Sequence, residues 1–147
     1  MGKIIIGSDH GGYNLKQKIK EVFSGKGYEF EDVGTYSTES CDYPVYAEKL
    51  AQKVIETNGR GILICGTGIG MTIAANKFKG IRAALCGDTF SARMTREHND
   101  SNVLCLGERV TGQDLALDIV NIWLETPFSN GERHINRLNL IKDIENK

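Results

Sequence analysis

The feature that most constrains the fold of this chain is the alternation of short apolar segments with longer segments of helical periodicity. Five segments rich in β-branched residues are predicted to be strands: KIIIG (3–7), YEFEDVG (28–34), GILIC (61–65), IRAALC (81–86) and NVLCLG (102–107). Several are apolar throughout, as expected when both faces of a sheet are covered. Five successive β–α units predict an α/β protein with a five-stranded parallel sheet and helices on both faces.

The intervening segments carry apolar residues at helical spacing, and Pro44 suits the first turn of the second helix. The residues expected on the buried faces of three helices are, in turn, Leu15, Ile19, Val22 and Phe23; Ala47, Leu50, Ala51, Val54 and Ile55; and Ile119, Val120 and Trp123.

The chain continues after Pro127 with a segment that the five β–α units do not need. A loop is followed by a predicted amphipathic helix at about 133–145, with apolar residues at 138, 141 and 140 or 144. Such a helix either packs on a second subunit or covers the edge of its own sheet, and we expect the former. All of residues 1–147 are expected to form a single domain.

The composition narrows the classes of function. The formal net charge is −1 at pH 7, so the chain lacks the bulk basicity typical of nucleic-acid or membrane-surface binding. Its four cysteines show neither a CxxC pair nor the spacing of a zinc site, so no metal is expected. The first residues make a poor signal peptide, and a cytoplasmic location with free thiols is expected. Cys86 and Cys105 lie in apolar runs and are interpreted as buried hydrophobic residues.

The stretch ILICGTGIG, at 62–70, ends a predicted strand in a cysteine and continues into a glycine-rich loop. Three known loop patterns fail here. A dinucleotide loop needs a third glycine, and a tyrosine-phosphatase loop an arginine, where this chain has Met71. A Walker loop needs a lysine, and none occurs before Lys77. The loop is therefore either a tight strand–helix turn or a set of converging amides that binds an oxyanion.

Cys65 favours the oxyanion interpretation. A helix is predicted over MTIAANKF, at 71–78, and the positive end of a helix favours the thiolate form of a nearby cysteine. A weak base beside oxyanion donors suits proton transfer next to a carbonyl group. Thr67 could add a hydroxyl donor to the same loop.

Further polar residues lie where open parallel sheets bind ligands, beyond the carboxyl ends of the strands. Three such places are predicted, at residues 8–12, at residues 65–70 and from Asp88 onward. Asp9 and His10 belong to the first, although Asp9 could instead cap the helix that follows.

Five more polar residues are candidates. His98 and Asn99 end the fourth predicted helix, where a helix-terminal cation, a surface residue or a cap would also explain them. Arg133 and Arg137 share one helix face, which suits a phosphate grip but also a solvated surface. Arg109, after the fifth strand, is a less specific candidate.

Taken together, GSDHGG, CGTGIG, REHND, LGERV and RHxxR resemble the ribose-5-phosphate isomerase B family, which includes the related galactose-6-phosphate isomerase subunits. The resemblance covers the whole chain. It implies a Rossmann-like three-layer α/β/α sandwich with an extra C-terminal helix, and a homodimer, sometimes a tetramer, with active sites at the subunit interface. It also implies interconversion of ribose 5-phosphate and ribulose 5-phosphate without a metal or another cofactor.

The resemblance also implies roles for individual residues. Cys65 resembles the base that moves a proton between C1 and C2, and His98, assisted by Thr67, resembles the residue that opens the sugar ring. Residues that resemble the anion hole for the enediolate are Gly66, Thr67, Gly68, Ile69 and Gly70. Residues that resemble substrate-binding positions are Asp9, His10, Asn99 and Arg109, and those that resemble the phosphate grip are His10, Arg133 and Arg137. Some of these are expected to come from the second subunit.

The position of Ile69 separates two branches of the family, because one branch has a glutamate base there. The cysteine branch is therefore indicated. Two other functions stay open: an isomerase of a six-carbon sugar, allose 6-phosphate or galactose 6-phosphate, and a sugar-phosphate binding or phosphocarrier module. A carrier would have no use for His98 or the terminal arginine pair.

Overall fold

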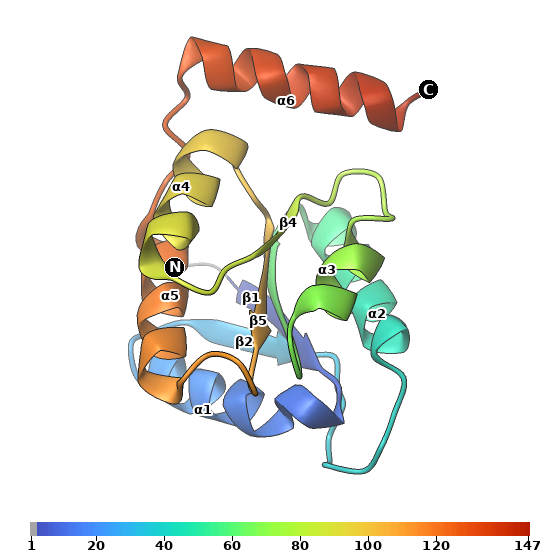
Figure 1. Cartoon of the computed structure of the whole chain (residues 1–147), viewed down its shortest axis with the longest axis vertical. Coiled ribbons are helices and arrows are strands. Elements are labelled where there is room, and N and C mark those ends of the chain that lie inside the picture. Colours follow the sequence, from blue (N-terminus) through green and yellow to red (C-terminus); the bar gives the residue numbers. More distant parts are fainter. Residues whose placement is uncertain (1–2) are drawn as a thin grey trace.

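The structure is a computed structural model that describes residues 3–147. It contains five strands, one short 3-10 helix and six α-helices among these residues (Figure 1). In chain order the elements are β1 (Lys3–Ser8), η1 (His10–Gly12), α1 (Tyr13–Ser24), β2 (Glu29–Asp32), α2 (Tyr43–Thr57), β3 (Arg60–Cys65), α3 (Ile69–Ala75), β4 (Ala83–Leu85), α4 (Thr89–Asn99), β5 (Val103–Gly107), α5 (Gln113–Glu125) and α6 (Glu132–Glu145).

The five strands form one parallel sheet in the order β2-β1-β3-β5-β4, which confirms the predicted α/β architecture. The strand order changes direction between β1 and β3. The chain therefore leaves the ends of these two neighbours toward opposite faces of the sheet. Such a point is a topological switch point, where open parallel sheets bind ligands in the crevice beyond the strand ends. Gly12 allows α1 to approach this edge closely, since a methyl group there would lie 2.4 Å from the Ile64 carbonyl oxygen.

Two apolar layers hold the helices to the sheet. Helices α1, α4 and α5 pack on one face, around fully buried residues such as Ile19, Ile64 and Trp123. Helices α2 and α3 cover the other face, with Leu50, Leu63 and Met71 at its centre. Side chains alternate along each strand, so β1 and β3 are apolar on both faces and read as unbroken apolar runs in the sequence.

Most residues expected in the core are buried, with one clear exception. Ile55 follows the apolar spacing of α2 but is 48% exposed, because it lies at the margin of the helical stripe rather than over the sheet. Cys86 and Cys105 are buried as expected, and burial raises the pKa of each thiol to about 12. Pro44 lies in the first turn of α2, as expected.

The boundaries of three predicted elements are wrong, and the first is the strand predicted at 28–34, which shortens to the four residues of β2. Helix α3 begins at Ile69 and ends at Ala75, so the first-turn amides belong to the CGTGIG motif itself rather than to the segment after it. The predicted strand at 81–86 shortens to the three residues of β4 at the edge of the sheet. None of the helices in the described part of the chain is long and apolar enough to cross a membrane.

Helix α6 does not join either layer. Figure 1 shows it lying across the top of the molecule, at the amino ends of the strands, whereas η1 lies at the bottom, at their carboxyl ends. Glu145 accepts hydrogen bonds from the backbone amide of Gly80, and Ser129 binds the Glu97 carbonyl through its hydroxyl at 2.7 Å. These contacts join both ends of the α6 region to its own chain, and the packing of α6 on a second subunit stays a prediction.

Candidate active site

The loops that follow β1 and β3 meet at the crevice between these strands. The amide of Asp9 donates to the Ile64 carbonyl at 3.2 Å, which joins the start of one loop to the end of the neighbouring strand. A methyl group on Gly11 would lie 3.2 Å from the Gly66 amide nitrogen. Two of the three places predicted for ligand binding are therefore adjacent.

Cys65 ends β3 on the face covered by α2 and α3, and it is a free thiol that is 5% exposed. The backbone amide of Gly68 donates to its Sγ atom at 3.1 Å. Gly68 adopts a left-handed conformation, with φ of 81°, and its turn brings the amide back toward the sulfur. The turn thus places one N–H donor directly on the sulfur atom.

The rest of the glycine loop is held by local contacts. The Thr67 hydroxyl accepts a hydrogen bond from the Ile69 amide at 3.2 Å, so it stabilises the first turn of α3. Within residues 3–147, no protein group accepts a hydrogen bond from the amides of Gly66, Thr67 or Gly70. These amides are therefore free to bind a ligand.

Arg109 lies over this loop. Its amide donates to the Gly66 carbonyl at 3.0 Å, and a methyl group on Gly66 would lie 3.2 Å from its Nη1 atom. The neighbouring Glu108 accepts a hydrogen bond from the Leu15 amide at 2.6 Å, which joins the turn after β5 to α1. Three loops, after β1, β3 and β5, are thus connected at one edge of the sheet, with a guanidinium group among them.

The β1 loop carries Asp9 and His10. Asp9 Oδ1 accepts hydrogen bonds from the amides of Gly11 and Gly12 at 2.9 and 3.2 Å, so the capping role left open by the sequence is real. His10 Nδ1 accepts a hydrogen bond from the Cys41 amide at 3.2 Å. Asp9 shapes the loop, and His10 lies between it and the segment before α2.

The other predicted site residues lie at the opposite end of the molecule. Helix α4 begins beyond the carboxyl end of β4 and runs back antiparallel, so His98 and Asn99 in its last turn lie near the amino ends of the strands. Arg133 and Arg137 lie on α6, which crosses that same end (Figure 1). The His98 ring stacks on His134 of α6, with ring centroids 4.3 Å apart. One chain therefore does not bring these four residues to Cys65.

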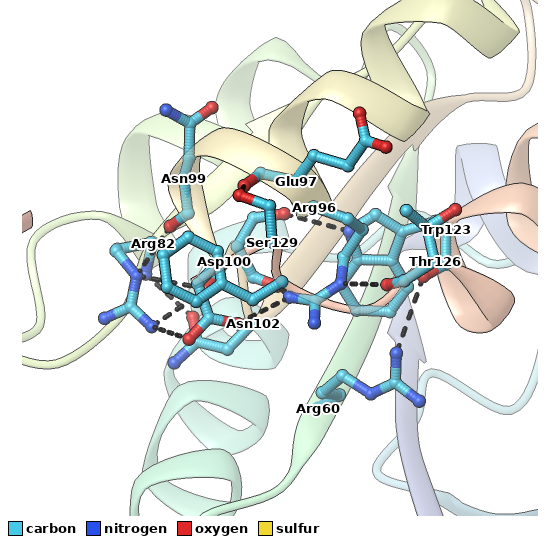
Figure 2. A network of polar contacts seen from close by, with 12 residues as sticks. Arg60, Arg82, Arg96, Glu97, Asn99, Asp100, Asn102, Trp123, Thr126 and Ser129 are labelled. Carbon is cyan, nitrogen blue, oxygen red and sulfur yellow. Dashed lines mark hydrogen bonds and ion pairs between the residues drawn. The ribbon is translucent and has the colours of Figure 1, made fainter. Parts of the chain in front are cut away.

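A polar network fixes the end of α4 and the linker to α6 (Figure 2). The buried Arg96 donates through Nε to the Thr126 carbonyl at 3.0 Å and through Nη1 to Asp100 Oδ1 at 2.9 Å. Asp100, with φ of 44°, is the cap residue of α4, so the cap proposed for Asn99 lies one residue later. Trp123 donates to the Ser101 hydroxyl at 3.0 Å, and its ring centroid lies 5.3 and 5.9 Å from the guanidinium carbons of Arg60 and Arg96. The network therefore ties the end of α4 to the end of α5 and to the start of the linker that leads to α6.

Electrostatics at this end oppose a charged His134. Burial lowers its pKa from 6.5, and the nearby His98, Arg133 and Arg137 lower it further, while Glu97 acts in the opposite direction. The His134 imidazole therefore lies in a region of positive potential. Such a region attracts anions.

Sequence reasoning missed several residues that the structure brings to these sites. The Tyr43 ring lies against Gly70, where a methyl group would be 2.6 Å from its Cε1 atom. Cys41 contacts His10, Glu108 contacts α1, and His134 contacts His98. Of these, His134 had a signal in the sequence, because it lies between the two arginines of RHxxR. Cys41 belongs to an irregular segment without periodicity, and Tyr43 is the first residue of α2, directly after that segment.

Asp88 is not part of the crevice. It caps α4 by accepting a hydrogen bond from the Ser91 amide at 2.7 Å, and it follows the edge strand β4, two strands away from β3. Within the described residues, no three His, Cys, Asp or Glu side chains converge as metal ligands would.

Comparisons with known proteins give the family. A family model described as Ribose/Galactose Isomerase matches residues 4–141. Ribose-5-phosphate isomerase B of Escherichia coli is 48% identical, over 100% of this chain and 99% of that protein. The solved ribose-5-phosphate isomerase B of Clostridium thermocellum is 56% identical with a TM-score of 0.95, over 98% of this chain and 97% of that one. The corresponding Thermotoga maritima structure is 51% identical with a TM-score of 0.92, over 96% and 97%. The chain therefore belongs to the ribose/galactose isomerase family and is an enzyme with the aldose–ketose isomerase activity that this membership supports.

Proposed function

We propose that this enzyme interconverts ribose 5-phosphate and ribulose 5-phosphate through an enediolate, with Cys65 as the base. The Cys65–Gly68 contact carries the proposal, because it puts a buried thiol and an amide donor at the same crevice. The names of the Escherichia coli and Clostridium thermocellum relatives support this substrate. The alternative is a six-carbon sugar phosphate, which the galactose in the family description supports.

The residues at the carboxyl ends of β1, β3 and β5 carry out the following steps. Cys65 takes the proton from C2 of the open-chain aldose and returns it to C1, while the hydroxyl proton of O2 passes to O1. Removal of the C2 proton places negative charge on the former carbonyl oxygen, O1, and the free amides of the loop from Gly66 to Gly70 stabilise it. Arg109 and Asp9 bind substrate hydroxyl groups beside them. A positioned base contributes roughly 10²–10⁴ in rate, and an oxyanion donor about 10²–10³.

The residues at the opposite end supply the remaining steps from a second copy of the chain. In this homodimer, His98 of one subunit opens the sugar ring at the crevice of the other, with Thr67 assisting, and Asn99 binds the sugar. Arg133 and Arg137 bind the phosphate together with His10 of the crevice. This arrangement accounts for the separation of the two groups in one chain, since neither end alone offers a base, an anion hole and a phosphate site.

Exposed apolar residues support the same assembly. Ile135, Leu140 and Ile144 of α6 are 41%, 54% and 66% exposed. Beside the glycine loop, Leu85 and Val110 line an apolar hollow of about 360 Å³. Both ends of the molecule thus leave apolar surface uncovered in a single chain, as expected for surfaces that meet a partner.

The test is a panel of five- and six-carbon aldose phosphates, assayed for aldose–ketose conversion with the wild type and Cys65→Ala. We expect the highest kcat/KM for ribose 5-phosphate, and a loss of about 10²–10⁴ in kcat with retained binding in the variant. Cys86→Ala, which removes another buried thiol, is the control and should keep its rate. A Cys65→Ala variant with near-normal turnover would show that the base is another residue. A higher kcat/KM for a six-carbon sugar would favour the alternative substrate, and binding without turnover by the wild type would indicate a carrier.

A further inference from the structure

Lys16 is an unusual residue of α1, because its side chain has no exposed surface. Lysine is almost never fully buried unless its charge is partnered. Neither the sequence motifs nor the proposed chemistry uses it. Its burial beside the loop that carries His10 therefore requires a separate explanation.

The ammonium group of Lys16 is held from several sides. It binds Asp32 Oδ1 at 2.7 Å and the carbonyl oxygen of Thr35, and it lies 5.5 and 5.3 Å from the ring centroids of Tyr13 and Tyr36. Burial lowers the pKa of Lys16, whereas its contact with Asp32 opposes that change. Burial alone would raise the pKa of Asp32, but hydrogen bonds from Lys16 and Lys20 bring it below its usual value. The two residues therefore form a buried ion pair.

The partners of Lys16 begin the irregular segment that joins β2 to α2. Asp32 is the last residue of β2, and its Oδ1 atom also accepts a hydrogen bond from the Gly34 amide at 2.8 Å. Thr35 adds a main-chain contact with β1 by donating to the Ser8 carbonyl at 2.7 Å. Lys16 thus ties the start of the segment to α1, which continues directly from η1 and His10.

The far end of the same segment reaches the crevice. The Cys41 amide donates to His10 Nδ1 at 3.2 Å, and Tyr43, the first residue of α2 after the segment, lies against Gly70. An imidazole nitrogen that accepts a hydrogen bond carries no proton, so a neutral His10 has its proton on Nε2. The segment therefore fixes both the orientation and the tautomer of His10.

We propose that Lys16 is a positioning residue for substrate binding: it secures residues 32–35, so that the Cys41 amide stays on His10 and His10 presents Nε2–H to the phosphate group. The inference rests on the proposed function, which assigns the phosphate contact to His10. Lys16 itself does not touch the substrate. Its effect passes through the main chain of the segment.

The test compares Lys16→Met with Lys20→Met. Both substitutions remove an ammonium group that binds Asp32. The Lys20 side chain, however, is 30% exposed, and its Nζ atom binds Asp32 Oδ2 at 2.9 Å without a hydrogen bond to Thr35. We expect Lys16→Met to raise KM about tenfold, as when one hydrogen bond to a charged group is misdirected, with kcat within about twofold. Lys20→Met should leave both constants within about twofold of the wild type. Equal effects of the two variants would overturn the proposal.

A second readout does not depend on activity. The ¹⁵N spectrum of the histidine-labelled wild type should show an unprotonated Nδ1 and a protonated Nε2 for His10, and Lys16→Met should show a mixture of tautomers. A wild-type His10 with its proton on Nδ1 would overturn the proposal even if Lys16→Met does not fold. If the wild type isomerises no sugar phosphate, the proposed function fails, while the tautomer still decides whether the segment fixes His10.

Discussion

Ser8 shows how one buried atom can cost stability beside a functional loop. Its hydroxyl is fully buried at the end of β1 and has no hydrogen-bond partner among the residues that the structure describes. A buried polar group without a partner loses its hydration and gains nothing in return. Ser101 is the opposite case, because its equally buried hydroxyl accepts the hydrogen bond from Trp123.

These two serines make a matched pair for a stability measurement. Ser8→Ala should raise the free energy of unfolding by about 1 kcal/mol, because it removes an unsatisfied hydroxyl. Ser101→Ala should lower it by about 1 kcal/mol or more, because it leaves the indole N–H without an acceptor. Urea unfolding followed by circular dichroism measures both changes. Changes of the same sign in the two variants would contradict the explanation.

At the scale of elements, α6 shows what helical periodicity predicts and what it does not. The spacing of apolar residues predicts a helix at about 133–145, and α6 spans Glu132–Glu145. Periodicity identifies the apolar face of a helix but not the surface against which it packs, because many surfaces bury the same side chains. The position of α6 across the amino ends of the strands depends instead on specific contacts, such as those of Ser129 and His134.

The His98–His134 stack makes the docking of α6 sensitive to pH. The pKa of His134 is below 6.5 in the folded chain, so folding favours its neutral form. Its contribution to stability is therefore complete above pH 6.5 and is lost as the pH falls through the lowered value. Thermal unfolding at pH 7.5 and 5.5 should show a smaller acid destabilisation for His134→Gln than for the wild type. Asn139→Ala, on an exposed position of α6, should retain the wild-type difference.

At the scale of the whole molecule, the strand order decides which residues can meet within one chain. The loops after β1, β3 and β5 converge because these three strands are neighbours. His98 and the arginines of α6 lie at the other end, because α4 returns antiparallel to the strands. A site built from both groups therefore needs two chains, and it can be tested by recombining defects.

Mixing Cys65→Ala with Arg133→Ala tests the shared site. Each variant alone should have little activity, because every site in its dimer lacks one residue. After subunit exchange, a mixed dimer has one site with both defects and one intact site, so about a quarter of wild-type activity should return from an equal mixture. Activity is measured before and after exchange, and exchange is verified with tagged subunits. No recovery after verified exchange would mean that each site uses one chain.

The sequence predicts the fold better than the site. Unbroken apolar runs such as that of β3 require cover on both faces, so the layers follow from local patterns. The convergence of Asp9, Cys65 and Arg109 follows in turn from the parallel sheet. The contacts of Cys41 with His10 and of Tyr43, the first residue of α2, with Gly70 could not be predicted. The irregular segment that leads to α2 has no period, and its path depends on distant partners such as Lys16.

The switch point between β1 and β3 has a consequence for how this family diversifies. The crevice exists because the main chain departs to opposite faces of the sheet, so its presence does not depend on the side chains that line it. Substitution of the residues that line the crevice can therefore change which sugar is accepted, while the stability of the scaffold is retained. A scaffold of this kind is evolvable, and we expect the exchange of a few crevice residues to change the preference between sugars of different chain length without loss of the fold.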